Sequence, residues 1–288
     1  MRIIVFAIIA VLGAVFLLCP PAYAWWPTTH LFLGREALDQ ASLLSPYLNA
    51  LLTGHPLDFL YGSIFADMSI GKKFFMYARL AHNWRVGFAL KDGAKTDEQL
   101  ACAYGYLAHL AADTVSHNEY VPFKLVEHYS MLGRGHLFFE GRLDAILPDH
   151  KIHKLSKEVI AKGSEHNDEF LERSLAKTLF SFETNRRIFR GLMTINRNTG
   201  LQLYRRYRAQ LRNHISHPEM EKYIARSLDA VMDFLEHTRS AQCYALDPHG
   251  KKAIKQASRL RSKLRRSKGS PKMLKEALEI VTVGPHGS

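Results

Sequence analysis

Three side chains of the kinds that bind metal ions follow one another at helical spacing: His109, Asp113 and His117. Positions i, i+4 and i+8 of a helix lie on one face, so these three groups could reach a common ion. The positions around them are mainly Leu and Ala, which predicts that this face is buried. Unpaired burial of a carboxylate and two imidazoles is costly, and a bound metal would satisfy all three groups. A buried His–Asp hydrogen-bond pair is the alternative that the spacing leaves open.

Further candidate ligands lie on both sides of this helix. His136 and Glu140 are again four residues apart, and Leu137, Phe138 and Phe139 between them make a fully solvated face a poor fit. Upstream, Asp67 ends an apolar run and His82 stands alone. Either of these two has an ordinary explanation, since a single Asp is commonly a helix cap and a lone His commonly a hydrogen-bonded core residue. Only the set as a whole indicates a metal site.

The first 24 residues have the pattern of an export signal. Arg2 precedes an uncharged apolar run over residues 3–18, Pro20 and Pro21 interrupt it, and residues 22–24 read Ala-Tyr-Ala, which is typical of a cleavage site. The run is short for a membrane anchor, which is the alternative. We predict cleavage after Ala24 and export to the periplasm or to the medium.

Cleavage after Ala24 would make Trp25 the first residue of the mature protein. Its free amino group and its carbonyl oxygen could then chelate a metal ion as a five-membered ring. His30 follows five residues later and could add a third donor.

The elements that position these side chains are predicted to be helices. Helical periodicity dominates the chain, and no strand-turn-strand pattern stands out. Thr28 or Thr29 can begin a helix to about Leu44, and Thr96-Asp-Glu-Gln99 is a capping box that opens a helix to about His117, before Pro122. Further helices are predicted over 136–147, 166–182, 184–195, 198–213 and 217–238. The sequence therefore predicts an all-α protein with one globular domain over residues 25–245.

The net charge of +12 arises mostly near the C-terminus. Residues 251–275 contain eleven Lys and Arg and no acidic residue. We therefore predict that residues 246–288 form a basic tail or an amphipathic helix. Such a segment suits an anionic partner, either a membrane surface or nucleic acid, although a solvated tail would have the same composition. No obligate protein partner is predicted.

Two cysteines remain after the predicted cleavage, Cys102 and Cys243. They could form a disulfide in an oxidising compartment, or each could be a buried thiol. The sequence leaves both alternatives open.

The order of the candidate ligands resembles that of the zinc-dependent phospholipase C and single-strand nuclease superfamily. The matching positions are Trp25, His30, Asp67, His82, His109, Asp113, His117, His136 and Glu140. Two segments, residues 60–67 (Leu-Tyr-Gly-Ser-Ile-Phe-Ala-Asp) and residues 105–117, look more specifically like bacterial proteins of the zinc-dependent phospholipase C family. The resemblance covers residues 25–145. It implies a secreted, multi-helix bundle with up to three zinc ions in a cleft and a ligating Trp at the mature N-terminus.

The resemblance also implies how the ligands are shared among the ions. Asp67, His82, His109 and Asp113 would hold one zinc, His117, His136 and Glu140 a second, and Trp25 and His30 a third, with Asp113 bridging two ions. One departure affects the second ion. In the family the His after the bridging Asp usually comes later, whereas His117 follows Asp113 by four residues. His128 is a conceivable substitute.

The implied activity is hydrolysis of a phosphodiester by a zinc-activated water, with Asp67 in a second role as the residue that orients or deprotonates that water. We expect a phospholipase C-like hydrolase that acts on a phospholipid or another phosphodiester. A single-strand nuclease or other zinc phosphodiesterase is one alternative. A metal-stabilised binding protein that has lost catalysis is the other.

Overall fold

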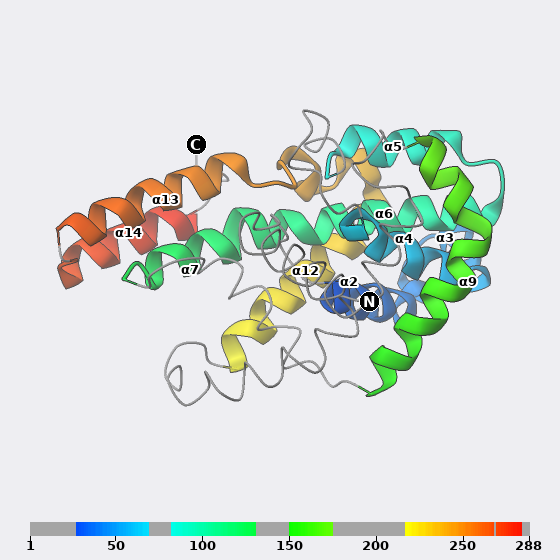
Figure 1. The fold of residues 1–288 in the computed structure, drawn as a ribbon, viewed down its shortest axis with the longest axis horizontal. Helices are drawn as coiled ribbons and strands as arrows, with labels where there is room; N and C mark the ends of the chain where they lie inside the picture. Colours follow the sequence, from blue (N-terminus) through cyan, green and yellow to red (C-terminus); the bar gives the residue numbers. More distant parts are fainter. Residues whose placement is uncertain (1–26, 69–81, 131–149, 175–216, 268, 284–288) are drawn as a thin grey trace, which may run out of the picture.

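The computed structural model describes residues 27–68, 82–130, 150–174, 217–267 and 269–283, and every regular element in these ranges is helical (Figure 1). The predicted all-α class is therefore confirmed. In chain order the α-helices are α2 (Pro27–Asp39), α3 (Pro46–Gly54), α4 (Pro56–Met68), α5 (Trp84–Gly93), α6 (Asp97–Val115), α7 (Val121–Glu127), α9 (His150–Ser174), α12 (His217–His237), α13 (Lys251–Arg266) and α14 (Pro271–Val283). Short helical turns are η1 (Ala41–Leu43), η4 (Ser116–Tyr120), η6 (Thr238–Ser240) and η7 (Gln242–Ala245). None of the described helices has the length and hydropathy needed to cross a membrane.

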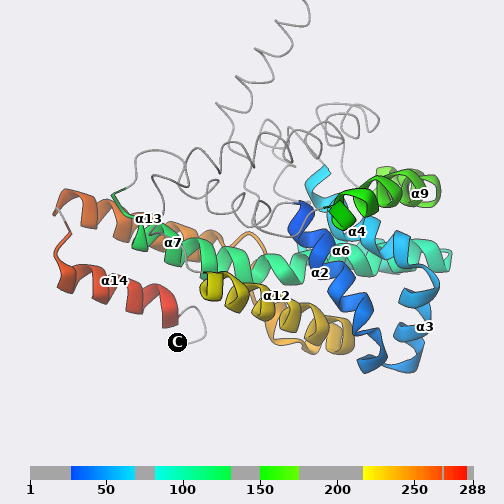
Figure 2. The same ribbon diagram turned by 90° about the horizontal axis from the view of Figure 1, so that it is seen from below.

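The centre of the molecule is the helical segment formed by α6, η4 and α7. Figures 1 and 2 both show it running along the length of the molecule, with α13 and α14 beside α7 at one end. At the other end α6 packs against α2, α3, α4, α5, α9 and α12. Every residue of α6 from Ala101 to Val115 is buried, so its His and Asp side chains lie inside the protein.

The start of α6 follows the predicted capping box. The Oγ1 atom of Thr96 accepts a hydrogen bond from the backbone N–H of Gln99 at 3.3 Å. The side chain of Gln99 reaches back one residue further than expected and accepts from the N–H of Lys95 at 3.0 Å. Both bonds satisfy amide groups that a helix start leaves without an intrahelical partner.

α6 ends at Val115, two residues before the predicted end near His117, but the helical course of the chain goes further. The chain continues through η4, which is a π-helix, directly into α7. Pro122 stands in the first turn of α7, where a missing backbone N–H removes no intrahelical hydrogen bond. The wider π-turn thus lets a helical segment pass a proline that would otherwise end it, and such turns are frequent at functional sites.

Two other helix boundaries differ from the prediction, and three predicted helices lie outside the described residues. α2 ends at Asp39 instead of Leu44, because a 3-10 turn and the extended residue Ser45 precede Pro46 at the start of α3. α9 begins at His150, well before the predicted residue 166, and it runs through Gly163. That glycine packs against the ring of Tyr61 and does not break the helix. The helices predicted over 136–147, 184–195 and 198–213 lie outside the described residues, and α12 agrees with the prediction for 217–238.

α4 and α6 cross with their backbones in direct contact. A Cβ atom placed on Gly62 of α4 would lie 1.9 Å from the carbonyl oxygen of Cys102, and one on Gly105 of α6 would lie 1.9 Å from that of Phe59. Only glycine fits at both positions, because any side chain would have to displace a main-chain carbonyl. Ser63 and Asp67 follow on α4, so this crossing sets where they lie relative to α6.

Buried charged and polar side chains join helices that are distant in sequence. Lys124 of α7 is fully buried, and its ammonium group donates to Glu127 at 2.7 Å and to Glu219 of α12 at 2.6 Å. Asn167 of α9 donates to the carboxylate of Asp58 on α4 at 2.7 Å. Such pairs compensate the desolvation that burial imposes on each group.

The C-terminal part of the described chain packs onto this frame. The indole of Trp84 stacks on Phe234 with ring centroids 4.7 Å apart and donates its N–H to the carbonyl of Leu246 at 2.9 Å. α13 and α14 then lie next to each other and beside α7. Cys102 and Cys243 are both buried thiols and are not joined to each other.

Replacement of Gly105 by Ala is expected to destabilise the protein by about 2–3 kcal/mol or more, because the new methyl group would overlap the backbone of α4. For a protein of this size that corresponds to a fall of roughly 5–10 °C in the thermal unfolding temperature. Gly93→Ala is the matched control, since a Cβ atom there has no neighbour within 4 Å. Equal unfolding temperatures for the two variants would contradict the close crossing.

Candidate metal centre

Five of the predicted metal ligands come together in one buried cluster. His30 comes from α2, Asp67 from α4, His82 from the turn before α5, and His109 and Asp113 from successive turns of α6. None of the five is more than 5% exposed. We call these five residues the His–Asp cluster.

The donor atoms of the cluster are spaced as ligands around a metal ion. The Nε2 atom of His30 lies 3.2 Å from Asp113 Oδ1, that of His109 3.3 Å from Asp113 Oδ2, and that of His82 3.3 Å from Asp67 Oδ1. Ligand atoms of a tetrahedral zinc ion with bonds of about 2.1 Å lie about 3.4 Å apart. A direct N–H···O bond is usually near 2.9 Å, so the observed distances agree better with atoms that share an ion.

The two carboxylate oxygens of Asp113 face different imidazoles. Oδ1 is next to His30, whereas Oδ2 is 3.3 Å from His109 and 3.6 Å from His82. Two overlapping groups could each hold an ion, His30 with His109 and Asp113, and Asp67 with His82 and His109. One imidazole nitrogen ligates one ion only, so His109 must serve one group, while Asp113 can serve both through its separate oxygens.

Backbone hydrogen bonds orient two of the imidazoles. The Nδ1 atom of His109 lies 2.9 Å from the carbonyl oxygen of Ser63, and the Nδ1 atom of His117 lies 2.5 Å from that of Pro248. Because a carbonyl can only accept, each Nδ1 carries the proton and each Nε2 is left as a lone-pair donor. This arrangement is the usual support of a metal-binding His.

Several buried donor atoms of the site have no hydrogen-bond partner in the described part of the chain. They are Nε2 of His30, His109 and His117 and both carboxylate oxygens of Asp113. Buried polar atoms are nearly always satisfied, so the four such atoms on His30, His109 and Asp113, which form one group of possible ligands, need an explanation. A divalent cation supplies it, because it accepts electron pairs from all of them and balances the carboxylate charge.

The electrostatics of the site agree with this explanation. Burial would raise the pKa of Asp113, but the imidazoles of His109 and His30 outweigh it and hold that pKa well below its usual range. Burial lowers the pKa of His30 and of His117. For His109 burial also acts downward, but the carboxylates of Asp113 and Asp67 overcome it and raise the pKa. Ionised Asp113 and neutral His30 and His117 are the states that bind zinc, and the raised pKa of His109 means that the two carboxylates favour a positive charge there, which a bound cation would supply in place of the proton.

The other predicted ligands are placed as follows. His117 is fully buried in η4, and it belongs to neither of the two three-residue groups. The π-turn explains this in part, because it changes the angular spacing between residue 113 and residue 117. Trp25, His136 and Glu140 lie outside the described residues. His128, the proposed substitute, contacts Glu127 at 3.1 Å instead of the cluster.

Sequence reasoning missed His249, which the structure places at the edge of this site. Its ring centroid lies 5.6 Å from that of His82, and it stands alone in the sequence, far from the other candidate ligands. The carbonyl groups of Ser63 and Pro248 were also missed, and no sequence signal could have shown them, because any residue type can supply a backbone carbonyl.

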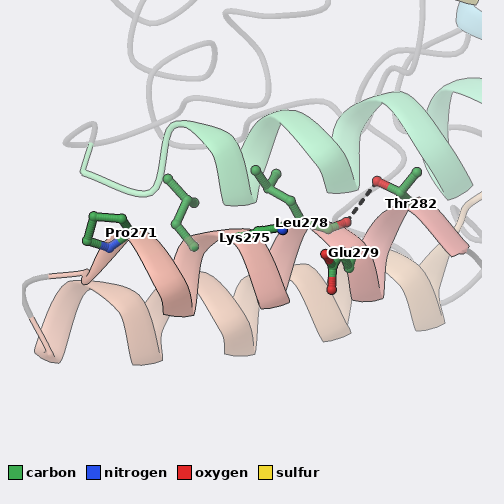
Figure 3. A pocket seen from close by; sticks show the side chains of 6 residues that line it. Pro271, Lys275, Leu278, Glu279 and Thr282 are labelled. Atoms are coloured by element: carbon green, nitrogen blue, oxygen red, sulfur yellow. Dashed lines mark hydrogen bonds between the residues drawn. The ribbon is translucent and has the colours of Figure 1, made fainter.

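A separate hollow on the surface is unrelated to the cluster. It is lined by Pro271, Leu274, Lys275, Leu278, Glu279 and Thr282, all from α14 (Figure 3). The hydroxyl of Thr282 is bonded within the helix, to the carbonyl of Leu278 at 2.8 Å. Residues from a single amphipathic helix with no converging polar groups do not make a catalytic site.

Comparison with known proteins agrees with the geometry. A family model described as zinc dependent phospholipase C matches residues 29–187, a range that includes all five residues of the His–Asp cluster. No curated protein and no solved structure gives a significant match.

Zinc is expected to raise the thermal unfolding temperature of the protein that begins at Trp25, and a chelator to lower it. A thousandfold excess of zinc over its Kd would add about 4 kcal/mol to the free energy of unfolding. Asp113→Asn should lose both the zinc and this stabilisation, because the amide replaces a charged oxygen that the site needs. Metal analysis and thermal unfolding are the measurements.

The control is His237→Ala, which removes an exposed His paired with Asp233 at the end of α12. It should bind zinc like the wild type. Unchanged zinc content in Asp113→Asn and in His109→Ala would contradict the assignment of the site.

Proposed function

This chain belongs to the zinc-dependent phospholipase C family, and on that premise we propose that it hydrolyses the phosphodiester of a phospholipid at the bond that joins the diacylglycerol to the phosphorylated head group. The proposal depends most on one observation. The His–Asp cluster gathers buried donor atoms at zinc-ligand spacing, and every one of its residues lies within the segment that matches the family.

Asp113 has the central role in this proposal. Its Oδ1 would serve an ion beside His30, and its Oδ2 an ion beside His82 and His109. The Ser63 carbonyl keeps His109 in the tautomer that presents Nε2 to the cluster. This orientation matters for catalysis. If the imidazole of His109 moved, the bound ion would move with it, and so would the water and the substrate on that ion.

Zinc bound at this site would supply two things, polarisation of the phosphoryl oxygens and a lowered pKa for the attacking water. Asp67 is the residue of the cluster to which we assign proton transfer. Its Oδ1 lies 3.3 Å from His82 Nε2 at the margin of the cluster, and a carboxylate at this position can orient a water molecule and accept its proton. No nucleophilic side chain is required.

Two large aromatic side chains near the cluster in the sequence, Trp84 and Phe88, do not decide the substrate. Trp84 and Phe88 pack in the interior, Trp84 on Phe234 and Phe88 beneath the guanidinium of Arg239 at 3.9 Å. The phospholipid assignment is therefore supported by family membership and by the basic surface described below. A single-strand nuclease and a non-catalytic zinc protein are kept as alternative outcomes of the test.

We further propose that the protein is exported and that cleavage after Ala24 frees Trp25 as a ligand. The support is the signal-peptide pattern of residues 1–24 together with the position of α2. α2 begins at Pro27, and His30 in its first turn is already in the cluster. A residue only five positions upstream of His30 is close enough in the chain to contribute a donor to the same site.

α13 carries a basic strip that we propose contacts anionic lipid. Ala257 and Leu264 of this helix are buried, and basic side chains cover its exposed surface. The exposed cations are Lys251, Lys252, Lys255, Arg259, Lys263, Arg265 and Arg266. α13 contains no acidic residue to offset them. Basic residues near an anionic bilayer each contribute about 1 kcal/mol, so this strip could hold the enzyme at its substrate.

The zinc-loaded protein is expected to release phosphocholine or phosphoethanolamine from phospholipid, and Asp67→Asn to reduce the rate by about 100-fold or more. Release of the phosphorylated head group is the measurement. Salt-sensitive cleavage of single-stranded DNA in its place would assign the protein to the nuclease alternative. No turnover of either substrate at full zinc occupancy would leave the non-catalytic alternative.

Replacing Lys255, Arg259 and Lys263 together by Gln is expected to weaken binding to vesicles of phosphatidylcholine and phosphatidylserine by about 100-fold, which is roughly 3 kcal/mol. Hydrolysis of a short-chain soluble phospholipid should not change, because none of the three replaced residues belongs to the His–Asp cluster or to the turn that precedes α13. The control variant replaces Lys154, Lys162 and Lys222, which are exposed on α9 and α12. Equal losses in the two triple variants would show that only net charge matters and would reject the strip as a specific surface.

A further inference from the structure

A turn near the C-terminal end of the described chain packs against the metal centre. Residues 247–250 (Asp-Pro-His-Gly) connect η7 to α13 and lie outside the segment that matches the family. The turn is closed by a hydrogen bond from the N–H of Gly250 to the carbonyl of Asp247 at 2.8 Å. The turn is therefore not part of the segment that the family model describes.

The turn is attached to the core by three side chains. His117 donates to the Pro248 carbonyl at 2.5 Å, Asn118 donates to the Asp247 carbonyl at 3.0 Å, and Trp84 donates to the Leu246 carbonyl at 2.9 Å. His117 and Asn118 come from η4, and Trp84 begins α5. Three bonds from two separate elements determine the position of the turn.

The turn also approaches η4 too closely for any side chain at Gly250. Its φ angle is +55°, a conformation that side chains disfavour. A Cβ atom there would lie 2.2 Å from the carbonyl oxygen of His117 and 2.6 Å from its Cβ atom. The glycine thus permits the contact that brings residue 249 to the site.

His249 lies beside two candidate ligands. Its half-buried ring is 5.6 Å from the ring of His82, similar to the 5.0 Å that separates His82 from His109 inside the cluster. The residues on either side of it in the chain both contact His117, Pro248 through the hydrogen bond at 2.5 Å and Gly250 through its close approach to the His117 backbone. The turn therefore holds His249 close to His82 and next to the residues that contact His117.

We propose that His249 is an additional imidazole ligand of the zinc centre, held in place by the turn of residues 247–250. The inference rests on the proposed zinc site, but it does not require that the protein hydrolyse lipid. It rests on the 5.6 Å between the rings of His249 and His82, a residue of one of the two three-residue groups, and on the bond from His117 to Pro248, the neighbour of His249 in the turn. It also makes the segment that precedes the basic helix α13 part of the metal centre.

The test is a zinc titration of the protein that begins at Trp25, with calorimetry and metal analysis as readouts. His249→Ala is expected to weaken the binding of one zinc ion by about 10–100-fold and to leave the tighter site unchanged. His237→Ala is the control, because that His is exposed at the end of α12. Wild-type affinity and stoichiometry in His249→Ala would overturn the proposal.

Two further variants separate ligation from a structural role. Added imidazole should restore zinc binding to His249→Gly, because it can occupy the vacated position, whereas a purely structural defect would not respond. Gly250→Ala should weaken the same zinc ion, since its methyl group would displace His117 or the turn. No response to imidazole would contradict ligation by His249, and full zinc affinity in Gly250→Ala would contradict the role of the turn.

The outcomes also distinguish this inference from the proposed function. A wild-type protein that binds zinc without hydrolysing lipid would reject the function alone. A lipid-hydrolysing protein whose zinc binding is indifferent to His249 would reject this inference alone.

Discussion

The contact between the backbones of α4 and α6 is the constraint on which the rest of the site depends. Gly62 and Gly105 leave no room for a side chain at the crossing, so the two helices approach to main-chain contact. Ser63 is then near enough for its carbonyl to accept from His109, one turn beyond Gly105. Asp67 follows one turn after Ser63 and lies beside His82 and His109. A wider crossing would separate the carboxylate of α4 from the imidazole and carboxylate of α6.

Burying these charged groups costs free energy, and the metal centre must compensate that cost. Two carboxylates and several imidazoles lie in a dry interior, where an uncompensated charge is strongly destabilising. Their mutual contacts are at ion-pair distances, yet several donor atoms have no hydrogen-bond partner among the described residues. A folded protein retains such an arrangement when a ligand completes it. The site thus resembles a metal centre more than a structural ion-pair network such as Lys124 with Glu127 and Glu219, where short hydrogen bonds satisfy the buried charge.

Much of the fold could be predicted from local patterns, and the failures have physical causes. The capping box at Thr96 and the apolar stretch behind it predicted the start and the burial of α6, which the structure confirms. The sequence did not predict that a π-turn and α7 continue the helical segment past the end of α6, through Pro122. Nor did it predict that α9 begins before Gly163, which lies inside that helix and contacts Tyr61. Pro122 and Gly163 are residue types that often end helices, but in both places the packing of the chain keeps the helical segment continuous.

By itself, the sequence determined the all-α class, the family and the residue types of the candidate centre, because these depend on periodicity and on ligand chemistry that each residue carries with it. It also placed His109 and Asp113 on one face, since their spacing belongs to a single helix. Only the tertiary structure decided which oxygen of Asp113 faces which imidazole, which carbonyl orients His109, and that His249 lies beside His82. Those contacts join segments far apart in the chain, and their geometry is determined by how the helices pack.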